Sequence, residues 1–177
     1  PDVTLPLAEL HDKCMWASLL ALLNSNPALE AEVSRSVVTF SLRHGGLGLR
    51  SAVRTRHAAY WSAWADCLHY MCVRFPDLCE SVRTHLQADE TLIDCLVSLR
   101  EAQVLLLSEG ASLPSWAELL AGSRPDPEPE EDREPGTFGR GWQCVASAVR
   151  GQAAVDRFLS RPMQHTLLSC VPSLVKV

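Results

Sequence analysis

The chain has 177 residues, of which 47% are hydrophobic and 21% charged, and its formal net charge is −5. This length fits one domain or a domain with an appendage, with enough apolar side chains for a core. No apolar run approaches the ~20 residues of a membrane-spanning helix, and the amino terminus lacks a signal-peptide pattern. We therefore predict an intracellular chain without a membrane partner. Because it starts at Pro1 rather than at a methionine, we also expect it to belong to a longer protein.

Apolar residues at helical spacing dominate the first half of the chain. They predict a helix over residues 6–23 and a short helix from Pro27 to about Ser34. Val37–Leu42 is the only β-branched stretch and is predicted to be a short strand or an extended segment. After a glycine-rich turn, Ser51 is expected to cap a long amphipathic helix, which Phe75-Pro76 ends.

The second half continues the helical pattern until an acidic interruption. Helices are predicted from Pro76 to about Leu86, over residues 90–108 and over a short segment ending at Gly122. Residues 123–137 are acidic, rich in proline and without a large apolar core residue, so a disordered linker is expected, followed by a helix over 142–159. The predicted fold is mainly α: an irregular helical bundle with at most one short strand or hairpin. The expected domains are 1–122, the linker 123–137, and 138–177.

The seven cysteines are an odd number, and no pair is spaced as Cys-x-x-Cys. Most of them fall at apolar positions of helical patterns, where cysteine behaves as a small hydrophobe. A chain of this size with such spacing does not resemble a disulfide framework. We therefore predict a reducing compartment, no disulfide and no cofactor.

Two pairs of residues, His11 with Cys14 and His69 with Cys72, place possible metal ligands one helical turn apart. A structural zinc site needs two tight pairs with matching geometry, whereas these pairs lie in apolar stripes, so no metal site is predicted. No Gly-x-Ser-x-Gly motif, cysteine-protease signature or pair of catalytic acids is present. Consequently we expect no catalytic residues in this chain.

The clearest candidate for binding is a glycine-rich stretch with nearby arginines. Between Ser34 and Ala65 there are five arginines and no acidic residue. A helix start with arginines beside it can hold a backbone phosphate, but the same residues also fit a tight structural turn with solvated side chains. The candidate nucleic-acid-binding residues are Arg43, Gly45, Gly46, Gly48, Arg50, Arg54 and Arg56. Trp61 and Trp64 can stack on bases, although aromatics at helical spacing more often belong to a core.

The run from Leu42 to Ala52, followed by the Ala/Trp-rich segment from Ala58 to Asp66, resembles a region downstream of the polymerase core in LINE-type (non-LTR) retrotransposon reverse transcriptases. The pieces around Trp116 and Trp142 are similar to the same kind of protein, so the resemblance spans about residues 5 to 150. It implies a helical, thumb-like element that grips the template-primer duplex. The parent family would be an RNA-directed DNA polymerase, whose Phe/Tyr-x-Asp-Asp motif is absent from this sequence.

The resemblance implies an accessory nucleic-acid-binding fragment without catalytic residues of its own. Its expected partners are a duplex or RNA–DNA hybrid, bound weakly and without sequence preference, and the upstream polymerase domain of the parent; its expected location is the nucleus. The alternative is a degenerate or domesticated relic that acts as a helical protein-interaction module. A small enzyme of unknown type is a third possibility.

The placement of the candidate arginines on the surface would distinguish the nucleic-acid-binding fragment from the protein-interaction module. Convergence of the four arginines on one exposed face favours nucleic-acid binding, whereas scatter or pairing with acids favours the interaction module. With four phosphate contacts, the logarithm of affinity should fall with the logarithm of salt at a slope of about −3 to −4. The acidic segment Asp126–Glu134 can compete for the same arginines, so its deletion should tighten binding.

Overall fold

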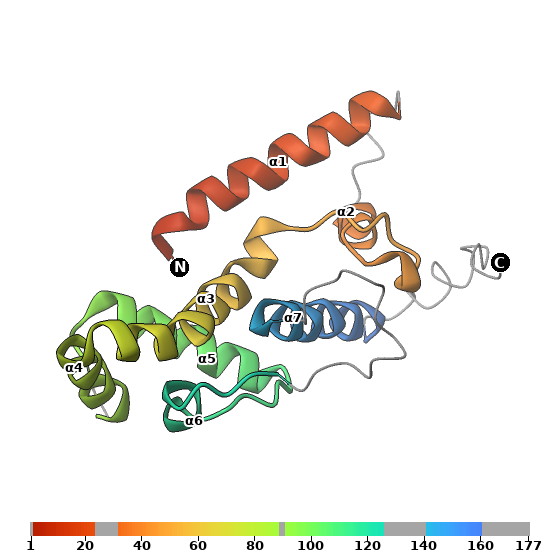
Figure 1. The fold of residues 1–177 in the computed structure, drawn as a ribbon. Helices are drawn as coiled ribbons and strands as arrows, with labels where there is room; N and C mark the ends of the chain where they lie inside the picture. Colours follow the sequence, from red (N-terminus) through yellow and green to blue (C-terminus); the bar gives the residue numbers. More distant parts are fainter. Residues whose placement is uncertain (1, 24–31, 89–90, 126–140, 161–177) are drawn as a thin grey trace, which may run out of the picture. The chain divides into compact units, whose positions relative to one another are not determined.

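The computed structural model describes residues 2–23, 32–88, 91–125 and 141–160 (Figure 1). Within these residues 77% are helical and no strand is present, which confirms the prediction of a mainly α fold. The predicted acidic linker lies almost entirely outside the described residues, because only its first three positions are included.

The helices follow the predicted order. They are α1 (Leu5–Leu22, after the 3-10 turn η1, Asp2–Thr4), α2 (Glu32–Val38), η3 (Leu42–His44), α3 (Ala52–Arg74), α4 (Pro76–Gln87), α5 (Asp94–Ser108), α6 (Trp116–Leu120) and α7 (Trp142–Leu159). The proline start predicted at Pro76 is present, since α4 begins there. Pro27, predicted to start the short helix to about Ser34, lies outside the described residues, and α2 is described from Glu32 to Val38. Ser115 and Glu118 form a capping box at the start of α6, in which each side chain pairs with the other residue's backbone N–H.

The β-branched stretch Val37–Leu42 is neither a strand nor extended. Its first residues complete α2, and the amides of Thr39 and Phe40 donate to the carbonyls of Ser36 and Val37. The following carbonyls are paired by the glycine-rich turn rather than by a neighbouring strand. Local turn hydrogen bonds therefore override the strand preference of valine, which is context-dependent.

The described fold divides into two units by its contacts. Unit 1 comprises Pro1–Asp2 and His57–Val149, and unit 2 comprises Val3–Arg56 and Arg150–Val177. Both α3 and α7 contribute residues to each unit. The domain boundaries predicted from composition, after residue 122 and before residue 138, stay a prediction.

The core of unit 1 surrounds the apolar stripe of α3. Trp61 and Leu68 are completely buried there with leucines of α5 and α6, and Trp61 meets Trp142 edge to face at 5.6 Å between ring centroids. Both candidate tryptophans thus serve packing, because Trp64 also packs against this cluster. The Tyr60 hydroxyl donates to the Cys95 carbonyl at 3.0 Å and fixes α3 to α5.

Unit 2 has a smaller core. Phe40 packs edge to face on Phe158, with 5.3 Å between ring centroids, and Val155 completes the buried cluster. On α1, Trp16 is 8% exposed, and the Arg35 guanidinium lies 5.3 Å from its ring centroid. An arginine over an aromatic face is a favourable cation–π arrangement, so α1 and α2 are joined by more than apolar contact.

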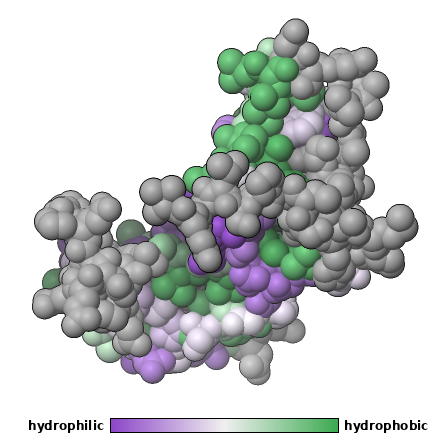
Figure 2. Space-filling model, turned by 90° about the vertical axis from the view of Figure 1, so that its right-hand side faces the viewer, coloured by the Kyte–Doolittle hydropathy of each residue, from purple (hydrophilic) through white to green (hydrophobic). Residues whose placement is uncertain are grey.

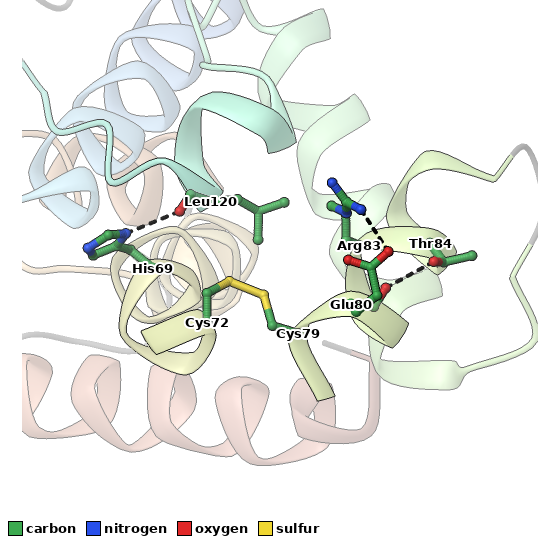
Figure 3. Close-up of a disulfide and its surroundings, with 7 residues drawn as sticks. All are labelled: His69, Cys72, Cys79, Glu80, Arg83, Thr84 and Leu120. Carbon is green, nitrogen blue, oxygen red and sulfur yellow. Dashed lines mark hydrogen bonds and ion pairs between the residues drawn. A yellow bond between two sulfur atoms is a disulfide. The ribbon is translucent and has the colours of Figure 1, made fainter. Parts of the chain in front are cut away.

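A disulfide joins Cys72 to Cys79, which corrects the prediction that no disulfide forms (Figure 3). The Phe75-Pro76 corner ends α3 and starts α4, and this brings two cysteines seven residues apart to a Cα separation of 4.9 Å. Such a separation is within the normal range for a disulfide. The sequence interpretation treated both residues as core hydrophobes and did not use the geometry of the corner.

The disulfide gives a direct prediction of thiol content. Denatured protein that has not been reduced should titrate two fewer thiols per chain with Ellman's reagent than the same protein after reduction. A Cys72→Ser/Cys79→Ser variant should lose this difference, whereas Cys67→Ser, which removes an exposed free cysteine, should keep it. Equal thiol counts before and after reduction would show that the two sulfurs stay reduced.

None of the helices in the described residues is long and apolar enough to cross a membrane. Several large apolar side chains nevertheless lie at the surface, and the face drawn in Figure 2 carries both hydrophobic and hydrophilic patches. Leu22 of α1 and Leu92 before α5 are 84% and 96% exposed. Single exposed apolar residues are ordinary on protein surfaces, so they do not by themselves define a site.

Candidate nucleic-acid interface

The glycine-rich turn folds back on the end of α2. The amides of Leu47 and Gly48 donate to the carbonyls of Val38 and Phe40 at 3.2 and 2.8 Å. Within the turn, η3 ends at Gly45, whose amide donates to the Leu42 carbonyl at 3.0 Å. The backbone amides of the turn therefore donate to carbonyls of the turn itself and of the segment that ends α2.

Each of the three candidate glycines has a steric reason to be glycine. Gly45 and Gly48 have φ angles of 75° and 72°, a region that other residues enter only with strain. Gly46 is buried, and a Cβ atom on it would collide with the carbonyls of Phe40 and Val37. These geometries account for the glycines without a ligand, so the motif by itself favours the structural-turn interpretation.

The amino terminus of α3 is occupied by a carboxylate from α1. Asp12 accepts hydrogen bonds from the Ser51 hydroxyl at 2.6 Å, the Ala52 amide at 2.7 Å and the Val53 amide at 3.3 Å. The next amide, of Arg54, donates to the Ser51 hydroxyl oxygen at 3.1 Å, which confirms Ser51 as the cap. Because these first helical donors are paired, the helix start predicted to receive a phosphate already holds an anion of the chain itself.

The same contacts set the acidity of Asp12. Partial burial alone would raise the pKa of this carboxyl, but hydrogen bonds from Ser51, Ala52, His11 and Val53 outweigh burial and lower the pKa below its ordinary value. The carboxylate is therefore the form that the fold stabilises. Its position at a helix amino terminus adds a favourable dipole interaction.

Arg54 points into unit 2 rather than to solvent. Its guanidinium donates to the hydroxyl and the carbonyl of Thr39 at 3.0 and 2.6 Å, and its own carbonyl accepts from Nε of the buried Arg150 at 2.9 Å. Burial, followed by the charges of Arg150 and Arg157, lowers the pKa of Arg54, while Asp12 acts in the opposite direction. The charged form of Arg54 is thus opposed by two other arginines and supported by one acid, Asp12.

The remaining candidate arginines divide into two kinds. Arg43 and Arg50, on either side of the turn, are exposed. Arg56 is half-buried and donates to the Val53 carbonyl within its own helix at 3.1 Å. The four candidate arginines therefore do not form one exposed face: two are available to a phosphate backbone, and two are directed into the structure.

Charge is distributed very unevenly between the units. Unit 2 has ten lysines and arginines against five acidic residues, whereas unit 1 has six against sixteen. The two balances, +5 and −10, add to the net charge of −5. The sequence order hides this separation, because residues 150–177 join residues 3–56 in unit 2.

Sequence reasoning missed Asp12, Thr39, Arg150 and Arg157. Asp12 lies about 40 positions from its partners, and the two arginines of α7 come from the far end of the chain. No short motif contains them, so only the pairing of distant helices shows their relation. A local search for basic residues near the turn could not find them.

The possible metal ligands have other contacts. Cys72 belongs to the disulfide, and a ring nitrogen of His69 lies 3.1 Å from the Leu120 carbonyl (Figure 3). His11 lies 3.1 Å from the Asp12 carboxylate. Across the parts of the chain that the structure describes, no group of three or more His, Cys, Asp or Glu side chains is placed to hold a metal ion.

Comparison with known proteins gives no relative: no protein-family model, curated protein or solved structure matches the chain. A function for the chain therefore rests on its own residues and geometry and on the resemblance of its glycine-rich segment.

Proposed function

We propose that this chain is an accessory nucleic-acid-binding fragment of a LINE-type reverse transcriptase, without catalytic residues of its own. The observation that carries the proposal is the basic balance of unit 2, ten cationic against five acidic side chains, in a protein that is acidic as a whole. Arginine-rich surfaces bind the phosphate backbone through charge and release condensed counterions. The expected ligand is a duplex or RNA–DNA hybrid, bound without sequence preference, and the expected location is the nucleus.

Within unit 2, the exposed Arg43 and Arg50 would make the phosphate contacts. The glycine-rich turn holds their backbone in a fixed conformation, which lowers the entropy lost when the side chains bind. Arg54 and Arg56 contribute to the positive field and to the fold, because their guanidinium groups already donate to protein oxygens. Phosphate contacts of this kind position a duplex but do not read its sequence.

An anisotropy titration with duplex DNA over a range of salt concentrations tests the proposal. With two phosphate contacts, the log–log slope of affinity against salt should be about −2, rather than the steeper value expected for four contacts. Arg43→Ala and Arg50→Ala should each flatten the slope by about one unit and weaken all sequences alike. Arg54→Ala and Arg56→Ala should leave the slope close to its original value and act mainly on stability.

Arg83→Ala is the matched control, because Arg83 is an exposed arginine on the acidic unit 1 and pairs there with Glu80. It should change neither the affinity nor the slope. Deletion of Asp126–Glu134 should tighten binding by removing competing negative charge. If the deletion variant does not bind any duplex or hybrid at low ionic strength, the proposal fails.

One observation favours the alternative, a helical protein-interaction module. Asp12 accepts hydrogen bonds at the start of α3, and Arg54 and Arg56 donate to backbone carbonyls of the chain. These contacts stabilise the fold and do not form an exposed basic surface. Under this alternative, Arg43→Ala and Arg50→Ala would leave duplex binding unchanged. The titration therefore separates the two functions.

A further inference from the structure

One side of α1 packs in unit 2, and the opposite side is apolar and exposed. On the inner side Ala8 and Trp16 are buried, and Asp12 pairs with the start of α3. The other side carries a line of exposed apolar residues, called here the outer stripe: Val3, Leu7, Leu10, Cys14, Ala17 and Ala21. Val3 belongs to η1 and the others to α1. A helix that is apolar on two sides is normally covered on both.

The spacing of the outer stripe is that of a helix-pairing seam. Its members follow one another at intervals of four, three, four, three and four residues, which is the 3.5-residue average of a coiled coil. Val3, Leu7 and Leu10 are 93%, 70% and 57% exposed, so the large side chains of the seam are open to a partner. A contiguous apolar seam differs in this respect from single exposed leucines elsewhere on the surface.

The order of side-chain sizes along the outer stripe fits a second copy of the same stripe in antiparallel orientation. Its large residues occupy the first half and its small residues the second half. Around a two-fold axis, Leu7 then faces the partner's Ala17, and Leu10 faces the partner's Cys14. Every layer joins one large and one small side chain, which keeps the helices evenly spaced. A parallel pair would put leucine on leucine at one end and alanine on alanine at the other, and would leave a gap.

We propose that the outer stripe of α1 is a homodimer interface in which the stripes of two copies pack antiparallel. Residues 3–21 rise about 27 Å along the helix axis, at ~1.5 Å per residue. Two helices that meet over this length bury on the order of 1,000 Å² in total, the lower limit of a specific interface. Antiparallel packing also places each positive helix amino end beside a negative carboxyl end. The dimer should therefore dissociate on dilution.

Sedimentation equilibrium of the full chain without nucleic acid tests the dimer. Leu7→Glu should be monomeric, and Leu7→Ala should dimerise about tenfold more weakly or worse, because two leucines lose their burial in each dimer. Val104→Glu is the matched control, since Val104 is a 64% exposed apolar residue of α5 in unit 1, and it should dimerise like the unmodified chain. An unmodified chain that stays monomeric up to about 1 mM, or equal dimerisation of Leu7→Glu, overturns the proposal.

A size exchange tests the antiparallel orientation. Ala17→Leu alone adds bulk opposite the partner's Leu7 and should weaken the dimer. The double variant Leu7→Ala/Ala17→Leu again has one large and one small residue in that layer, so it should dimerise better than either single variant. Residues in contact show such coupling, whereas distant ones add. Additive effects of the two changes would overturn the antiparallel orientation.

Cysteine crosslinking tests the register. In the proposed dimer the two Cys14 residues are offset by about 6 Å along the axes, in addition to the distance between the helices, which is too far for a disulfide. On oxidation, Leu10→Cys should form disulfide-linked dimers with the partner's Cys14, and the native Leu10 chain should not. Dimers linked through Cys14 alone, or none in Leu10→Cys, would overturn the register. Both chains carry serine in place of the other cysteines outside the disulfide, which are Cys67, Cys95, Cys144 and Cys170.

Salt dependence separates this interface from association through charge. The two copies meet through the basic unit 2, so added salt should strengthen the dimer or leave it unchanged. Association of unit 2 with the acidic unit 1 of another copy would weaken with salt, and such weakening would overturn the apolar interface. Duplex binding by Arg43 and Arg50 also weakens with salt, but it is measured separately. A monomeric Leu7→Glu that still binds duplex keeps the two proposals distinct.

Discussion

Replacing Asp12 with alanine is expected to lower the free energy of unfolding by about 1–3 kcal/mol. The substitution removes the acceptor for the amides of Ala52 and Val53 and for the hydroxyl of Ser51. Ser51 can still cap the Arg54 amide, so α3 should form, but it would start without its charged partner. Urea unfolding followed by circular dichroism at neutral pH measures the loss.

The effect of Asp12 should depend on pH in a defined direction. Because the folded pKa of Asp12 lies below its ordinary value of 3.8, the carboxylate contributes stability that is fully present above that value. The contribution is lost as pH falls through the lowered folded pKa. The stability difference between the unmodified chain and Asp12→Ala should therefore be largest near neutral pH and shrink in strong acid.

Glu9→Ala provides the control on the same helix, because Glu9 is an exposed acid of α1. Its effect should stay within about 0.5 kcal/mol, as for most surface substitutions. An equal loss for Glu9→Ala and Asp12→Ala, or a difference that grows in acid, would contradict a specific role for Asp12 at the start of α3.

Most of the helices could be predicted from the sequence because they are specified by neighbouring residues; the end of α2, predicted as a strand or extended segment, is the exception. The spacing of Trp61, Ala65 and Leu68 places them on one face of α3, and the structure buries all three. Pro76 and the pair Ser115 and Glu118 similarly mark helix starts by local chemistry. Apolar periodicity and helix capping involve residues within one or two helical turns of each other, so both can be recognised without knowledge of the tertiary fold.

The candidate site was less predictable because its properties come from distant pairs. In the sequence, Arg50 and Arg54 are equivalent members of a basic segment, but only Arg50 is exposed and Arg54 turns toward Thr39. The helix start that favours phosphate in isolation is filled by Asp12 of α1. A local pattern shows which groups can bind an anion, whereas the tertiary fold decides which of them are already paired.

Gly46→Ala is expected to destabilise the chain by about 1–3 kcal/mol, the usual cost of forcing extra atoms into a packed site. The new methyl group would meet the carbonyls of Phe40 and Val37, and backbone atoms cannot move aside as the end of a flexible side chain can. The turn would have to open, which weakens the bonds from Leu47 and Gly48 to the end of α2. Chemical denaturation of the variant measures this loss.

Gly151→Ala is the matched substitution with the opposite expected sign. Gly151 lies inside α7, and a Cβ atom there would have nothing within 4 Å to collide with. Alanine is favoured over glycine in a helix interior by about 0.5–1 kcal/mol, so this variant should be more stable than the unmodified chain. The same chemical change would thus weaken the turn and strengthen the helix. If Gly46→Ala is also stabilising, the turn tolerates a side chain, and the close approach to Phe40 and Val37 is not what selects glycine at this position.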